Sequence, residues 1–84
     1  MMNITATIIG RKNCMWCREA RKLCKANNIN YDYKDLDAPA NAQLRRWFEV
    51  ENIKTVPQIF VLEEGKSELV GGYEDFAQFL KNRS

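Results

Sequence analysis

The segment ITATIIGRKNCMWC, residues 4–17, decides the fold of this chain. Residues 4–9 are apolar and β-branched for the most part, which favours a buried strand. The glycine and polar residues that follow favour a turn. Apolar residues then recur at helical spacing, which predicts a helix over residues 14–26. The two cysteines, Cys14 and Cys17, are therefore expected at the start of the helix that follows the first strand.

Two further helices and three further strands are expected downstream. Residues 29–34 alternate between apolar and polar side chains, which is strand periodicity. Asp37, with Pro39 close behind, favours the start of a second helix. Residues 58–62 and 68–70 predict the two strands of a hairpin. An apolar stripe near the C-terminus predicts the last helix.

These elements follow the order β-α-β-α-β-β-α, which places the chain in the α/β class. A helix joins the first two strands, so they are expected to be parallel. The hairpin adds antiparallel strands, giving a mixed four-stranded sheet flanked by three helices. The chain has 84 residues and shows no repeat or linker, which fits a single domain over residues 1–84. The pattern does not reveal the order of the strands in the sheet.

Composition excludes several classes of protein. A net charge of +2 with 29% charged residues is not the strongly basic balance of a nucleic-acid binder. No apolar run approaches the roughly 20 residues that span a membrane, and the N-terminal residues lack the basic leader of a signal peptide. We therefore expect a cytoplasmic protein, in which a close cysteine pair is more often redox-active or metal-binding than structural.

Cys14 and Cys17 are the candidate catalytic residues. Cys14 is expected at or near a helix N-terminus, where unpaired N–H groups and the helix dipole favour thiolate over thiol. The positive charges of nearby Arg11, Lys12 and Arg18 also favour the thiolate form of Cys14. Cys17 lies one helical turn later on the same face, so it can attack a mixed disulfide formed on Cys14. The spacing thus predicts a nucleophile, Cys14, and a resolving thiol, Cys17.

Two simpler interpretations of the pair stay open at this point. It could be half of a metal site, or two inert core cysteines. Zinc normally takes four ligands, whereas this chain has no histidine and only one further cysteine, Cys24. Cys24 takes an apolar helix position and is expected in the core. We therefore predict no metal site.

Three segments, in order, resemble the glutaredoxin family. They are Asn13-Cys14-Met15-Trp16-Cys17, Thr55-Val56-Pro57-Gln58-Ile59-Phe60 and Gly71-Gly72-Tyr73-Glu74-Asp75. The likeness covers nearly the whole chain, and the middle segment is its most specific part. It implies a thioredoxin-like fold and a glutathione-dependent thiol-disulfide oxidoreductase. Glutathione would be a co-substrate, with no permanently bound cofactor.

The resemblance also implies a glutathione site. Pro57 would be cis, a geometry found in only about 5–6% of X-Pro bonds and so not predictable from the residues alone. The backbone of Val56 would then pair with the cysteinyl part of glutathione. The helix start behind Gly72 would bind the γ-glutamyl carboxylate, and Asp75 would pair with the amino group. The implied glutathione-binding residues are Arg11, Trp16, Lys54, Thr55, Val56, Pro57, Gly72, Tyr73, Glu74 and Asp75.

Some of these residues also have a plainer explanation. Arg11 and Lys54 could meet the glycyl carboxylate of glutathione, but charges beside surface loops are usually only solvated. Pro57 could simply be the proline at the first residue of a strand. Glu74 and Asp75 favour the dipole of the last helix whatever binds there.

The chain departs from the family between its two cysteines. Glutaredoxins commonly carry Pro and Tyr there, and this chain has Met15 and Trp16. Met15 lacks the backbone stiffness of proline, which leaves the reduction potential and the preferred substrates open. Protein disulfides and glutathione mixed disulfides are the expected substrates. Ribonucleotide reductase is one client that the family suggests, although no residue selects it, and a monomer is expected.

Two alternatives keep Cys14 but change the function. The first is a redoxin recycled by thioredoxin reductase. Such proteins tend to carry a Trp-Ser-Gly-Phe-type stretch, whereas residues 70–76 here read VGGYEDF, which favours glutathione. The second is a dimer that holds a [2Fe–2S] cluster with two nucleophilic cysteines and two glutathione molecules. Met15 and Trp16 argue against the cluster, because that form usually has small residues beside the cysteine.

Overall fold

The strand β1 (Thr5–Gly10) occupies an inner position in the sheet, as its apolar sequence requires. In the computed structural model, which describes residues 3–83, it pairs in parallel with β2 (Asn30–Asp35) and antiparallel with β3 (Gln58–Glu63). The strand β4 (Lys66–Gly71) pairs antiparallel with β3, so the order is β2-β1-β3-β4. The expected mixed sheet with a parallel first pair is confirmed.

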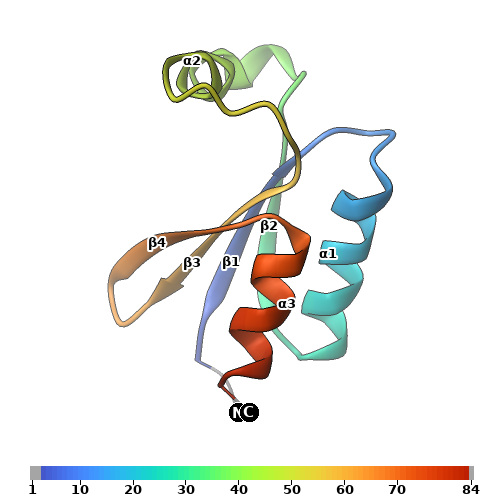
Figure 1. Ribbon diagram of the computed structural model, residues 1–84, viewed down its shortest axis with the longest axis vertical. Helices are drawn as coiled ribbons and strands as arrows, with labels where there is room; N and C mark the ends of the chain where they lie inside the picture. The colour runs from blue at the N-terminus through green and yellow to red at the C-terminus, as the bar shows by residue number, and fades with distance from the viewer. Residues whose placement is uncertain (1–2, 84) are drawn as a thin grey trace.

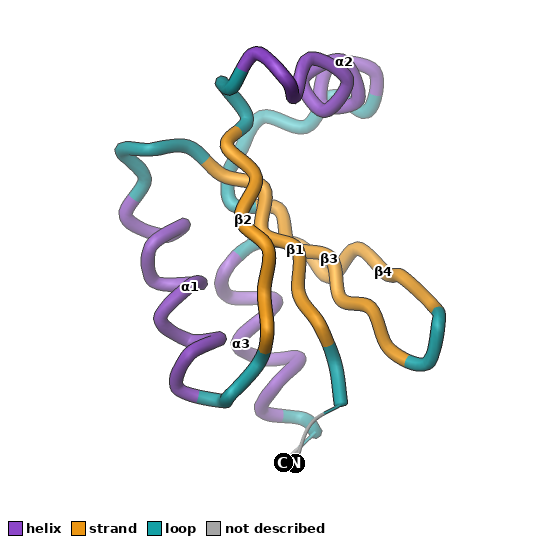
Figure 2. Tube along the Cα trace, turned by 180° about the vertical axis from the view of Figure 1, so that it is seen from behind, coloured by secondary structure: helices purple, strands orange, loops and turns teal. Residues whose placement is uncertain are grey.

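Two helices cover one face of this sheet and a third lies apart from them. The helices α1 (Met15–Ala26) and α3 (Tyr73–Lys81) run side by side (Figure 1). A short 3-10 helix, Pro39–Asn41, leads into α2 (Ala42–Val50), which lies near the end of the sheet where β1 and β2 finish (Figure 2). None of the helices within residues 3–83 is long and apolar enough to cross a membrane.

Alternating residues of β1 divide the core in two, because successive strand residues point to opposite faces. Ala6 and Ile8 are fully buried in the larger cluster, which also holds Phe76 of α3. Ile9 belongs to a smaller cluster with Leu36 and with Phe48 of α2. The larger cluster fixes α1 and α3 on the sheet, and with them the N-terminal ends of both helices.

The structure differs from the sequence-based expectation at two places. β4 begins at Lys66 rather than at residue 68, because its pairing with β3, and not its own polar sequence, defines it. The helix start that Asp37 and Pro39 predict is present, with a helical turn beginning at Pro39, but Asp37 is not its N-cap. Ala38 is the cap residue of the turn that leads into α2, and the Asp37 carboxylate accepts a hydrogen bond from Arg11 at 2.7 Å instead.

Candidate active site

The cysteine pair lies at the N-terminus of α1 and is joined as a disulfide. Cys14 is the N-cap residue with an extended backbone, and Met15 is the first helical residue. The expected helix start is therefore correct to within one residue. The Cα atoms of Cys14 and Cys17 are 5.2 Å apart, so both sulfurs belong to the first turn.

The Cys14 sulfur takes the place of a capping side chain. It accepts a hydrogen bond from the backbone N–H of Cys17 at 3.2 Å. That N–H is one of the donors that a helix N-terminus leaves without an intrahelical partner. The first turn of α1 holds no acidic residue, so nothing in that turn offsets the positive end of the helix dipole. In the reduced protein the same contacts favour a negatively charged sulfur.

Cys17 differs from Cys14 in exposure. The Cys17 side chain is only 1% exposed, whereas Cys14 is partly exposed. The close packing around Cys17 depends on Gly10, because a Cβ atom there would lie 2.6 Å from the Cys17 sulfur. A nucleophile must reach its substrate and a resolving thiol needs to reach only its partner sulfur. The partly exposed Cys14 is accessible to a substrate, and the buried Cys17 is accessible to the Cys14 sulfur.

Cys24 stands two turns after Cys17 and is fully buried. Burial raises the pKa of its thiol to about 11, so this sulfur keeps its proton at neutral pH. Its core position agrees with the expectation from helical spacing. Among residues 3–83, no group of three Cys, Asp, Glu or His side chains could hold a metal ion.

A groove of about 550 Å³ opens beside Cys14. The Cys14 sulfur lies 3.9 Å from the carbonyl oxygen of Val56, which forms part of the groove wall. The wall comes from the start of α1, the segment before β3 and the start of α3. Its residues are Trp16, Thr55, Val56, Pro57, Gln58, Gly71, Gly72, Tyr73, Glu74 and Asp75.

The middle wall of the groove is the segment around Pro57. The Val56–Pro57 peptide bond is cis, as the resemblance implied. Pro57 is buried, while Val56 is partly exposed. The carbonyl oxygen of Pro57 would lie 3.6 Å from a Cβ atom at Gly72. The backbones of Pro57 and Gly72, which are far apart in the sequence, therefore lie close together in the lining of the groove.

The far wall is the N-terminal end of α3. Gly72 is its N-cap and offers no side-chain cap, which leaves backbone N–H groups of the first turn open to a ligand. Gly71 has φ +124°, which favours glycine, and a Cβ atom there would collide with the Asp75 carboxylate. The Trp16 and Tyr73 rings stand 5.1 Å apart, so α1 and α3 meet at one end of the groove.

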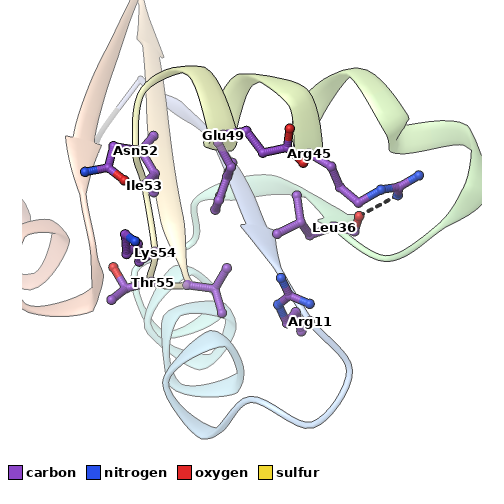
Figure 3. A pocket seen from close by; sticks show the side chains of 10 residues that line it. Arg11, Leu36, Arg45, Glu49, Asn52, Ile53, Lys54 and Thr55 are labelled. Atoms are coloured by element: carbon purple, nitrogen blue, oxygen red, sulfur yellow. Dashed lines mark hydrogen bonds between the residues drawn. The ribbon is translucent and has the colours of Figure 1, made fainter.

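Eight of the ten implied glutathione-binding residues line this groove. Arg11 and Lys54 instead line a second cavity of about 470 Å³ under α2. Figure 3 shows that Arg11 and Lys54 come from two different segments. Thr55 and Val56 line both spaces, so the groove and the cavity adjoin. Arg11 is already paired with Asp37 at 2.7 Å.

Sequence reasoning left two groove residues out of the implied site, Gln58 and Gly71. Each is the chain neighbour of a residue that was included, Pro57 and Gly72 respectively. Both residues also belong to the segments that resemble the family, so their place in those segments was a second signal. The Gln58 amide donates to the Thr55 carbonyl at 3.0 Å, which ties together the two ends of the segment that carries Val56.

Comparison with known protein families agrees with this geometry. The family model described as Glutaredoxin matches residues 6–66. The chain belongs to the glutaredoxin family. It is therefore a glutathione-dependent thiol-disulfide oxidoreductase with a thioredoxin-like fold, and Cys14 and Cys17 form its CxxC pair.

Solved glutaredoxins share this fold. Glutaredoxin 1 from Francisella tularensis, complexed with cacodylate, is 26% identical with a TM-score of 0.73, and 95% of each chain is covered. Reduced Escherichia coli glutaredoxin is 27% identical with a TM-score of 0.69, covering 93% of this chain and 94% of that one. A buckwheat glutaredoxin–glutathione complex is similar in fold, at 18% identity and a TM-score of 0.70, over 95% of this chain and 71% of that one. No curated protein sequence matches.

Proposed function

We propose that this glutaredoxin reduces protein disulfides and glutathione mixed disulfides, with Cys14 as the nucleophile and Cys17 as the resolving thiol. The observation that carries the proposal is the contrast between the two sulfurs. The Cys14 sulfur is partly exposed and accepts a helix N–H, and the Cys17 sulfur is buried beside it. We assign the activity to the cytoplasm, where the glutathione pool keeps such pairs reduced.

The proposed cycle follows from these positions. The Cys14 thiolate attacks a protein disulfide and forms a mixed disulfide, releasing the first substrate thiol. Cys17 then attacks the Cys14 sulfur and releases the second, which leaves the Cys14–Cys17 disulfide. Two glutathione molecules restore the two thiols and become glutathione disulfide. With a glutathionylated substrate, the Cys14 thiolate attacks the glutathione sulfur and releases the substrate thiol. A second glutathione then attacks that same glutathione sulfur, which forms glutathione disulfide and frees the Cys14 thiolate, so Cys17 is not needed.

Glutathione would occupy the groove beside Cys14. Its cysteinyl part would pair with the Val56 backbone, which would bring its sulfur near Cys14. Its γ-glutamyl carboxylate would meet the open N–H groups at the start of α3, and the amino group would meet the Asp75 carboxylate. Trp16 and Tyr73, in contact across α1 and α3, would close that end.

The glycyl carboxylate would point towards the adjoining cavity, where Lys54 is the better partner of the two basic candidates. The Arg11 guanidinium already donates a hydrogen bond to Asp37 at 2.7 Å. Breaking that interaction would cost free energy and would offset part of what a contact between Arg11 and glutathione contributes to binding. Lys54 is exposed, and it lines the cavity beside Thr55 and Val56. We therefore assign the glycyl end to Lys54.

The assignment of the two cysteines can be tested with two substrates. Cys14→Ser should abolish both insulin disulfide reduction and the release of glutathione from a glutathionylated peptide. Cys17→Ser should abolish the first activity and spare the second. Activity that survives in Cys14→Ser, or equal loss of both reactions in Cys17→Ser, would contradict the assigned roles. Running the insulin assay with glutathione or with thioredoxin reductase as the only reductant identifies the electron source.

The glutathione site has its own test. Asp75→Asn removes a carboxylate from the groove and should raise the KM for the glutathionylated peptide by about 2- to 5-fold, as expected for an exposed ion pair. Glu68→Gln is the matched control, because it removes an exposed carboxylate from β4, outside the groove. An equal effect of the two variants would mean that Asp75 acts only through net charge.

A further inference from the structure

Tyr33 of β2 reaches the active site from beneath the cysteine pair. Its hydroxyl donates a hydrogen bond to the backbone carbonyl of Arg11 at 2.7 Å, in the loop between β1 and α1. A Cβ atom on Gly10 would lie 2.5 Å from the Tyr33 oxygen and 2.6 Å from the Cys17 sulfur. Both atoms thus border one small space, which is kept open because residue 10 is a glycine.

The surroundings of Tyr33 keep its hydroxyl protonated. The Arg21 guanidinium lies 4.8 Å from the centre of the ring. Burial raises the pKa of Tyr33, the nearby Asp35 carboxylate adds to this, and Arg21 opposes it, with a net rise. A neutral phenol can donate one hydrogen bond and also accept from another group. Since its hydrogen goes to Arg11 in the oxidised form, its oxygen still has room to accept.

Building on the proposed cycle, we propose that Tyr33 is a positioning residue for the resolving step. In the reduced protein its hydroxyl is the hydrogen-bond partner of the Cys17 sulfur. Reduction breaks the bond to Cys14, and rotation about the Cys17 side chain can then bring its S–H to the Tyr33 oxygen. This contact holds the Cys17 sulfur under Cys14 until a mixed disulfide forms there.

In the resolving step, the Cys17 sulfur replaces the substrate sulfur on Cys14. Cys17 loses its proton to solvent, and the Tyr33 hydroxyl can turn to donate to the thiolate that forms, which stabilises the charge. The thiolate attacks the Cys14 sulfur of the mixed disulfide. The Cys14–Cys17 bond forms, and the bond between Cys14 and the substrate sulfur breaks. The substrate thiolate leaves with the electron pair and takes up a proton.

The proposed role is confined to Cys17. The Cys14 sulfur contacts the Cys17 N–H, which belongs to α1, and the Val56 carbonyl, which belongs to the segment before β3. Neither involves β2. Removing the Tyr33 hydroxyl should therefore slow the second half of the reaction and leave the first attack by Cys14 at its normal rate.

The test separates the two steps by stopped-flow absorbance. Fully reduced protein is mixed with one equivalent of dithiobis(nitrobenzoate). The Cys14 attack releases one coloured thiolate in a concentration-dependent phase, and ring closure by Cys17 releases the second in a concentration-independent phase. Tyr33→Phe, which keeps the ring, should slow the second phase by about 3- to 10-fold, as expected for one lost hydrogen bond. Tyr31→Phe is the matched control on the same strand and should change neither phase.

Each outcome decides the question. A second phase that is unchanged or faster in Tyr33→Phe overturns the proposal, as does equal slowing in Tyr31→Phe. Equal slowing of both phases in Tyr33→Phe would mean that the tyrosine only shapes the loop before Cys14. Failure of the proposed function looks different, because the wild type itself would then lack the two-phase release or Cys17→Ser would retain the second phase.

Discussion

The two ends of α1 carry the same functional group in opposite chemical settings. At the N-terminal end, the Cys14 sulfur is partly exposed and accepts a backbone N–H. In the last turn, Cys24 is buried among apolar residues and its pKa is raised to about 11. The negative end of the helix dipole also disfavours a thiolate there. Reactivity in this protein is therefore decided by the position of a cysteine on the helix and by its access to water.

The largest expected difference between the two ends is in alkylation rate. An ordinary exposed cysteine is roughly 3% thiolate at pH 7, and Cys14 should exceed that fraction. With a pKa of about 11, Cys24 should be thiolate in only about one molecule in ten thousand. Iodoacetamide should therefore label Cys14 at least about 300-fold faster in the reduced, folded protein. Mass spectrometry of the peptides over time measures both rates, and labelling of Cys24 within tenfold of Cys14 would refute the contrast.

The next effect is on stability at high pH. Because burial raises the Cys24 pKa to about 11, the folded protein holds this proton up to about pH 11, whereas the unfolded chain releases it near pH 9.0. Between those values the unfolded state binds fewer protons, so stability falls as the pH rises. The loss assigned to Cys24 should be about 2–3 kcal/mol.

Urea unfolding at pH 8 and pH 11 under reducing conditions measures this loss. Other groups also titrate in the interval, so the informative quantity is the difference between the wild type and Cys24→Ala. The variant should lose less stability across the interval by the stated amount. Equal losses in the two proteins would show that the Cys24 thiol has an ordinary pKa.

The smallest expected effect concerns how α1 ends. The Asn27 side-chain amide donates to the Leu23 carbonyl at 2.9 Å, and the Asn27 backbone N–H donates to the same oxygen at 3.2 Å. Asn27→Ala should cost about 0.5–1 kcal/mol and lower Tm by a few degrees. The Cys14 alkylation rate should not change. Gln43→Ala, which removes an exposed amide from α2, is the control, and an equal drop in Tm there would deny Asn27 a specific role.

Local patterns were sufficient to predict the elements of the fold but not how they pair. The apolar run before Gly10 and the spacing of Cys17 and Cys24 predicted β1 and α1 almost to the residue. β4 was placed too short, because Lys66 and its polar neighbours form an edge strand through pairing with β3. The order of strands depends on contacts between distant segments, and no local pattern encodes them.

The candidate site was predictable to the extent that chemistry follows from local position. A cysteine at a strand-to-helix junction indicates a reactive sulfur on physical grounds alone. The cis bond before Pro57 came from the family resemblance, because proline itself allows both isomers. The roles of Tyr33 and Gly10 could not be seen in the sequence, since β2 and α1 bring the Tyr33 hydroxyl and the Cys17 sulfur together only in three dimensions.

The packing of α3 against α1 affects when this protein can fold during its synthesis. Phe76 and Leu80 of α3 belong to the same buried cluster as Ala20 and Cys24 of α1, and the start of α3 also forms the far wall of the groove. On the ribosome, both cysteines of the pair emerge long before α3 does. The nascent chain therefore acquires a packed α1 and a place for its co-substrate in a single event, once α3 has been synthesised.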